Sequence, residues 1–227
     1  MFLWLSFYRK SLGKKAVMAS SGIILFGFVL VHMAGNLKLY LGSEHFNEYS
    51  EFLREVGAPA IPHEGALWIF RIVLLVAVIL HAHSAYTLTL DNWKARPVDY
   101  KKRQTIEATY ASRTMRWGGA IVALFVLYHL AHLTLGPSWA HPDFKPGEPY
   151  HNVVAGFQVW WVSAFYIAAN VFLGLHLDHG LWSMFRSLGW NRPGCDKPTR
   201  RFAQVFSWVV TLGILSFPLA VLAGVVR

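Results

Sequence analysis

The sequence predicts an all-α membrane protein with five transmembrane helices. Hydrophobic residues make up 55% of its 227 residues and charged residues 15%, which is too apolar for a water-soluble domain and too poor in charge for a disordered chain. Five apolar segments are close to or above the length of about 20 residues that a helix needs to cross a bilayer. We expect them, within a single domain spanning 1–227, at approximately 16–40, 66–90, 117–135, 155–184 and 202–226.

The segments between the apolar stretches have distinct characters. Residues 1–15 are basic and amphipathic and are expected to lie along the membrane surface. The apolar run that follows is about 25 residues, too long for the apolar region of a cleaved secretory signal, and is expected to be retained. Residues 42–65 carry five glutamates and are expected to form a short surface helix. The fifth apolar segment has no histidine and no charge between Arg201 and Arg227, and is expected to act as a buttress.

Positive charge is concentrated in three of the connecting regions, and this indicates the orientation of the chain. The formal net charge is +9, and the three regions hold 16 of the 21 lysines and arginines. These are Arg9, Lys10, Lys14, Lys15; Lys94, Arg96, Lys101, Lys102, Arg103, Arg113, Arg116; and Arg186, Arg192, Lys197, Arg200, Arg201. The positive-inside rule then predicts a cytoplasmic N-terminus and an external C-terminus in the cell inner membrane. Because the membrane topology accounts for the excess of lysine and arginine, this excess does not indicate nucleic-acid binding.

Cysteine usage limits the metal chemistry that the chain can support. Cys195 is its one cysteine, so an intramolecular disulfide, an iron–sulfur cluster or a cysteine-rich zinc site cannot be built from this chain alone. A metal would have to be bound through histidine or carboxylate.

Histidines inside the apolar segments are the main chemical signal. Ionisable groups in hydrocarbon are costly and normally face the interior of a bundle with a partner. Seven such histidines occur in the first four segments: His32, His81, His83, His129, His132, His176 and His179. Each of them could simply make a hydrogen bond between helices, as membrane bundles do.

The depth of these histidines favours two bis-histidine haem sites. With a rise of 1.5 Å per residue, His32 and His129 lie ~10 to 14 Å below the outer surface. By the same arithmetic His81 and His176 lie ~11 to 14 Å above the inner surface. Two histidines at equal depth on facing helices are what axial ligation of a haem requires, and this arrangement occurs twice.

Small residues in the same segments would leave room for a flat macrocycle. They include one residue a turn after each inner histidine. The positions are Ala85, Gly180, Gly22, Gly27, Gly118, Gly119 and Gly174. Small residues are also common wherever membrane helices pack together, which is the alternative explanation.

Several motifs resemble the cytochrome b subunit that anchors succinate dehydrogenase or fumarate reductase (respiratory complex II), in its five-span, two-haem type. The resemblance covers nearly the whole chain. It rests on His32-Met-Ala-Gly-Asn36, Phe46-Asn-Glu-Tyr49, His81-Ala82 with Ala85, His129-Leu-Ala-His132, and His176-Leu-Asp-His-Gly180-Leu-Trp182 with Gly189-Trp190.

The resemblance implies a fold in which the first four helices form a haem-binding bundle. It implies two haems b, an outer one ligated by His32 and His129 and an inner one ligated by His81 and His176. It further implies electron transfer between an iron–sulfur subunit and a membrane quinone, menaquinone by the same resemblance, with a flavoprotein (FAD) subunit oxidising succinate. His83, His132 and His179 remain open as contacts around the haem, quinone contacts or hydrogen-bonded core residues.

Polar residues near the membrane edges are expected to bind the haem propionates through charge-assisted hydrogen bonds. For the inner haem these are Ser20, Ser21, Arg113 and Arg116, and for the outer haem Arg71. The arginines could instead anchor their helices among lipid headgroups. Asp178 could take up protons for a quinone or could make a polar contact near the inner end of its helix.

Alternatives to this function remain open at the level of sequence. A fumarate-reductase anchor working in reverse is one, although some such proteins carry a glutamate two residues before the fourth ligand, where this chain has Gly174. Other cytochromes b, such as the hydrogenase or cytochrome b561 types, place two ligands far apart on one helix, unlike the close pairs seen here. A transporter or channel with a histidine relay is the third.

Overall fold

A computed structural model describes residues 2–95, 110–190 and 194–227, and every regular element in this part of the chain is helical. Within these described residues, five helical stretches are long and apolar enough to cross a membrane, which confirms the prediction of a multi-pass α-helical membrane protein. They are α2 (Ser11–Asn36) continued by a 3₁₀ turn η1 (Leu37–Leu41), α4 (Gly65–Lys94), α5 (Tyr110–Leu130) continued by a π-helical turn η2 (Ala131–Leu135), α7 (Trp160–Ser187) and α8 (Asp196–Leu222).

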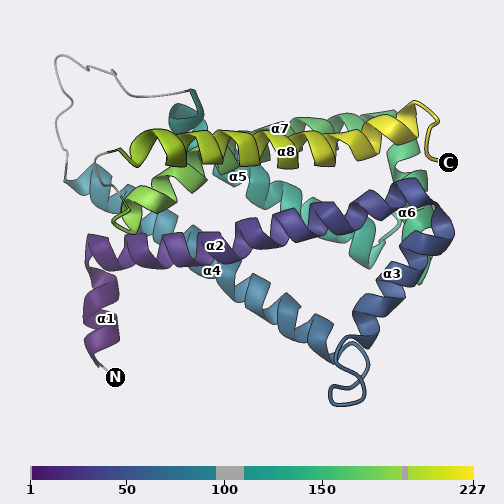
Figure 1. The fold of residues 1–227 in the computed structure, drawn as a ribbon, viewed down its shortest axis with the longest axis horizontal. Coiled ribbons are helices and arrows are strands. Elements are labelled where there is room, and N and C mark those ends of the chain that lie inside the picture. Colours follow the sequence, from purple (N-terminus) through teal and green to yellow (C-terminus); the bar gives the residue numbers. More distant parts are fainter. Residues whose placement is uncertain (1, 96–109, 191–193) are drawn as a thin grey trace.

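Three shorter helices lie at the two ends of the molecule. α1 (Phe2–Arg9) precedes α2 and turns away from it at Lys10, whose backbone is extended. α3 (Ser43–Glu55) and α6 (Pro149–Gln158) lie at the opposite end, near the C-terminus (Figure 1). After the orientation predicted from the charges, we call the end that holds α1 the inner end and the end that holds α3 and α6 the outer end.

The fourth apolar segment is divided, unlike the continuous helix expected over 155–184. Val159 has an extended backbone (φ −76°, ψ 104°), which separates α6 from α7. The Ser163 hydroxyl donates to the Phe157 carbonyl at 2.6 Å and the Ser163 amide to the Val159 carbonyl at 3.1 Å, so the break is satisfied by hydrogen bonds. The helix of this segment that is long and apolar enough to cross a membrane therefore begins at Trp160.

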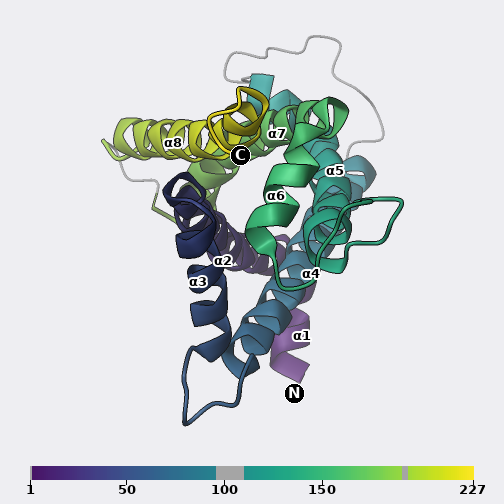
Figure 2. The same ribbon diagram turned by 90° about the vertical axis from the view of Figure 1, so that its right-hand side faces the viewer.

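The long helices form two layers. α2 packs against α4 in one layer, and α5 packs against α7 in the other, with α8 covering α7 (Figures 1 and 2). Contact between the layers runs mainly from α2 to α7 and α8. Among the described residues, α2 makes few close approaches to α5, and α4 makes few to α7.

The α7–α8 interface is closely packed. Ala203 and Val210 of α8 are fully buried. The Ser207 hydroxyl donates to the Gly174 carbonyl at 2.5 Å, and the Thr211 side chain occupies the space where a Cβ on Gly174 would lie. Gly174 therefore allows α7 to pack closely against α8. This is the second of the two roles that the sequence left open for small residues, helix packing rather than room for a macrocycle.

Replacement of Gly174 by alanine should loosen this interface. The added methyl group would meet the Thr211 side chain, and overpacking of this kind typically costs about 1–3 kcal/mol. We expect a lower midpoint of thermal unfolding for purified Gly174→Ala in detergent. Gly180→Ala is the matched control on the same helix, since nothing lies within 4 Å of a Cβ there. Equal midpoints for the two variants would contradict this description of the interface.

Candidate functional site

Two pairs of histidine rings connect the layers. His32 of α2 and His129 of α5 have ring centroids 5.9 Å apart with an interplanar angle of 89°. His81 of α4 and His176 of α7 have centroids 6.1 Å apart at 64°. We call these the outer pair and the inner pair. Each pair joins two helices that otherwise approach each other at few points, so the contact is made largely by the imidazoles.

The ring separations suit two imidazoles bound to one metal ion. Histidine nitrogens bind metals at about 2 Å, which places two opposing nitrogens ~4 Å apart and their ring centroids ~6 Å apart. Both pairs match this spacing. The structure thus brings together the same histidines that were expected at equal depth in the membrane from their positions in the sequence.

The inner pair is oriented by hydrogen bonding to α2. His81 Nδ1 lies 3.0 Å from the Met18 carbonyl oxygen and 3.4 Å from the Ser21 hydroxyl. Because a carbonyl can only accept, His81 Nδ1 carries the proton and Nε2 keeps its lone pair. Histidines that bind metals usually donate their other N–H in this way. His176 Nδ1 is buried and has no hydrogen-bond partner within the described residues.

Glycines face the rings of the inner pair. A Cβ on Gly22 of α2 would lie 3.5 Å from the His81 ring, and one on Gly119 of α5 would lie 3.7 Å from the His176 ring. In both cases the nearest ring atoms are Cε1 and Nδ1. Each histidine thus turns its Nδ1 side toward the neighbouring helix of its own layer.

The outer pair lies among aromatic side chains. Phe28 stacks on His32 at 5.2 Å, and Phe125 lies 5.8 Å from His129. His129 Nδ1 is 3.4 Å from the hydroxyl of Tyr166 on α7. His129 therefore also directs Nδ1 toward its own layer, as His81 and His176 do.

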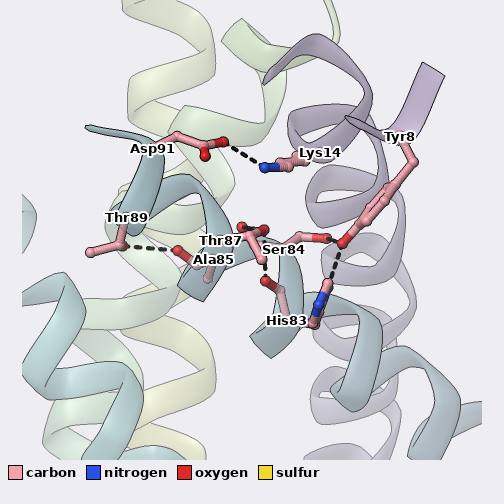
Figure 3. Close-up of polar contacts among 8 residues, drawn as sticks. All are labelled: Tyr8, Lys14, His83, Ser84, Ala85, Thr87, Thr89 and Asp91. Atoms are coloured by element: carbon pink, nitrogen blue, oxygen red, sulfur yellow. Dashed lines mark hydrogen bonds and ion pairs between the residues drawn. The ribbon is translucent and has the colours of Figure 1, made fainter. Parts of the chain in front are cut away.

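The three remaining histidines of these segments have other contacts. His83 Nδ1 lies 2.6 Å from the Tyr8 hydroxyl, and the two rings stack, so α1 is held against α4 (Figure 3). His132 Nδ1 lies 2.9 Å from the Tyr166 hydroxyl. His179 packs edge-on against Trp182. These contacts do not choose among the roles that the sequence left open for the three histidines, and their exclusion from the ligand set stays a prediction.

A polar cluster at the inner end could not be foreseen from the sequence. Lys14 of α2 forms an ion pair of 2.5 Å with Asp91 of α4, close to the contact of Tyr8 with His83 and Ser84 (Figure 3). In the sequence, Lys14 belongs to a basic run and Asp91 lies at the end of an apolar segment. They meet only because of how each helix is rotated about its own axis. The pair links the inner ends of α2 and α4.

The residues expected at haem propionates have varied surroundings. Ser21 donates its hydroxyl to the Val17 carbonyl at 2.7 Å and touches His81, while Ser20 is exposed on α2. Arg116 lies over the Trp93 ring at 5.7 Å and Arg71 over the Trp68 ring at 4.8 Å.

The two arginines with described side chains fit the alternative interpretation, in which they anchor helices near the headgroups. The Arg113 side chain lies outside the described residues. None of these contacts assigns a propionate partner, so the proposed roles of Ser20, Ser21, Arg113, Arg116 and Arg71 stay predictions.

Asp178 is paired with a cation. Arg200 of α8 reaches its carboxylate at 3.0 Å and also lies over the Trp182 ring at 5.3 Å. One oxygen of Asp178 is buried without a hydrogen-bond partner among the described residues. The ion pair supports the polar-contact interpretation of Asp178 near the inner end of α7.

A further group of possible metal ligands lies on the surface. Glu51, Glu55 and His63 have ligand atoms within 4.8 Å of one another, but all three are exposed. Glu55 is already bonded to His63, and Glu51 to Arg54, so ordinary surface pairing accounts for the group.

Comparison with protein-family models, with curated proteins and with solved structures gives no match to this chain. The geometry of the site and the motifs of the sequence therefore carry the functional argument.

Proposed function

We propose that this chain is the di-haem cytochrome b membrane anchor of a succinate:quinone oxidoreductase. The observation that carries the proposal is the pair of imidazole contacts between the layers, each with the spacing of two ligands on one metal ion. The set of donors, four histidines in two pairs, fits two low-spin haems b. When bound, the haems would supply one-electron transfer across the membrane.

The residues of the chain would hold and orient these groups. His32 and His129 would ligate the outer haem, and His81 and His176 the inner one. The Met18 carbonyl fixes the His81 tautomer with Nε2 free, and Gly22 leaves room beside the ring. Burial and hydrogen bonding around the ligands would set the potentials of the two sites.

The inner end is suited to soluble partners of the complex. Exposed cations gather there, whereas α3 at the outer end carries exposed Glu44, Glu48 and Glu51. The exposed cations are Arg9, Lys10, Lys15, Lys94, Arg116, Arg186, Lys197 and Arg201. An iron–sulfur subunit would bind at this basic cytoplasmic face, and a flavoprotein subunit attached to it would carry out the chemistry on succinate. The membrane quinone, by resemblance menaquinone, would exchange electrons with this chain.

The test uses native membranes that contain the whole complex. Addition of succinate should reduce a b-type haem, seen as the rise of its α-band, and deletion of this chain should abolish the response. A membrane in which succinate reduces no b-type haem, or in which the deletion leaves the response intact, would overturn the proposal. A purified chain without haem that still moves protons across vesicles would favour the histidine-relay alternative.

A further inference from the structure

The Tyr166 hydroxyl lies between two histidines of the outer half of the molecule. Tyr166 is 3% exposed, in the second turn of α7, and its oxygen is 3.4 Å from His129 Nδ1 and 2.9 Å from His132 Nδ1. A buried tyrosine hydroxyl normally has a hydrogen-bond partner, and this one has two potential partners. Only one of the two, His129, belongs to the outer pair.

The direction of these two hydrogen bonds follows from the role of His129. This step rests on the proposed function, in which His129 ligates through Nε2 and therefore carries its proton on Nδ1. His129 Nδ1–H then donates to the Tyr166 oxygen. The Tyr166 hydroxyl in turn donates its own proton to His132 Nδ1, the shorter of the two contacts.

His132 is held in place by its surroundings. It is 1% exposed and stacks on His141 at 4.8 Å, and His141 Nε2 donates to the Asn152 carbonyl at 2.8 Å. A Cβ on Gly156 would lie 2.6 Å from the His132 ring, so α6 closes over it. The acceptor for the Tyr166 hydroxyl is therefore rigidly positioned, and with it the orientation of the hydroxyl.

We propose that Tyr166 is a positioning residue for the outer site: it accepts the Nδ1–H of His129, fixes the orientation of that imidazole and increases its basicity as a ligand. The inner site has the same device in the Met18 carbonyl bonded to His81. A hydrogen bond of this kind makes the ligand a stronger electron donor and favours the oxidised metal. Tyr166 thus lowers the potential of the outer haem relative to a site without it.

Tyr128 of α5, the helix that packs against α7, provides a matched control. Its ring stacks on His132 at 5.5 Å and contacts the Tyr166 ring, but its hydroxyl is buried without a hydrogen-bond partner in the described part of the chain. Tyr166→Phe and Tyr128→Phe remove the same atom from the same cluster. Only the first removes a hydrogen bond to His129.

The experiment is a potentiometric titration of both haems in the purified full complex, followed by optical spectra. Tyr166→Phe should raise the midpoint potential of the outer haem and leave the inner one unchanged, and Tyr128→Phe should move neither. His132→Leu should raise the outer potential by a smaller amount, because Tyr166 keeps its oxygen but loses the acceptor that orients it. His132→Gln, which restores an acceptor, should lie closer to the unaltered protein.

The outcomes separate this inference from the proposed function. Two haems with unaltered potentials in Tyr166→Phe would overturn the role of Tyr166 and leave the haem assignment intact. Equal shifts in Tyr166→Phe and Tyr128→Phe would also overturn it, since packing alone would then explain them. Absence of haem from the unaltered complex would overturn the proposed function itself. If Tyr166→Phe fails to assemble, an unchanged outer potential in His132→Leu would refute the inference.

Discussion

Replacement of His129 by leucine is expected to remove the outer haem and leave the inner one. His32→Leu should give the same result, because these two rings face each other at 5.9 Å across the layers. His81→Leu and His176→Leu should each remove only the inner haem, since those rings form the second pair. In the proposed sites each variant would leave only one histidine to hold its haem, so each should lose about half of the haem.

Optical redox titration of the four purified complexes would separate the two haems by their potentials. His132→Leu is the control on the α5–η2 stretch: its ring is one turn from His129 but is bonded to Tyr166, so this variant should retain both haems. Loss of the inner haem in His129→Leu, or loss of a haem in His132→Leu, would contradict the pairing.

Replacement of Gly119 by leucine is expected to have the second largest effect, loss of the inner haem without any change to a ligand. A Cβ at this position would already lie 3.7 Å from the His176 ring, which is ordinary contact. The remaining atoms of leucine would have to displace the imidazole from its position opposite His81. Interiors packed this closely accommodate one methyl group far better than a branched side chain.

Gly119→Ala provides the graded control, and haem quantification of the two complexes is the measurement. The alanine variant should retain both haems and the leucine variant only the outer one. Retention of both haems in Gly119→Leu would show that this face of α5 does not limit the position of His176.

The fold and the pairing of histidines were largely predictable because both depend on local regularities. Apolar segment length gives the five spans, and the constant rise of an α-helix converts position in sequence into depth. Depth placed His32 level with His129 and His81 level with His176, but it did not decide which histidine of each close pair is the ligand. The resemblance to complex II anchors chose the same four residues among the seven.

The contacts around those histidines were not predictable, because they depend on how far each helix is rotated about its own axis. The contact of Ser21 with His81 and the packing of Gly174 on α8 are two examples. The break at Val159 depends on the Ser163 hydroxyl bond rather than on any proline or glycine at that position. Tyr166 could have been noticed as a hydroxyl in an apolar span, but its two histidine partners lie on another helical stretch.

Haem content of the purified, unaltered protein tests the central claim most directly. Extraction of the chain with its complex in mild detergent, followed by conversion of the haem to its pyridine complex and comparison with the amount of this chain, gives a stoichiometry. The two imidazole pairs predict two b-type haems per chain. A complex that is folded and complete but contains no b-type haem would contradict the account.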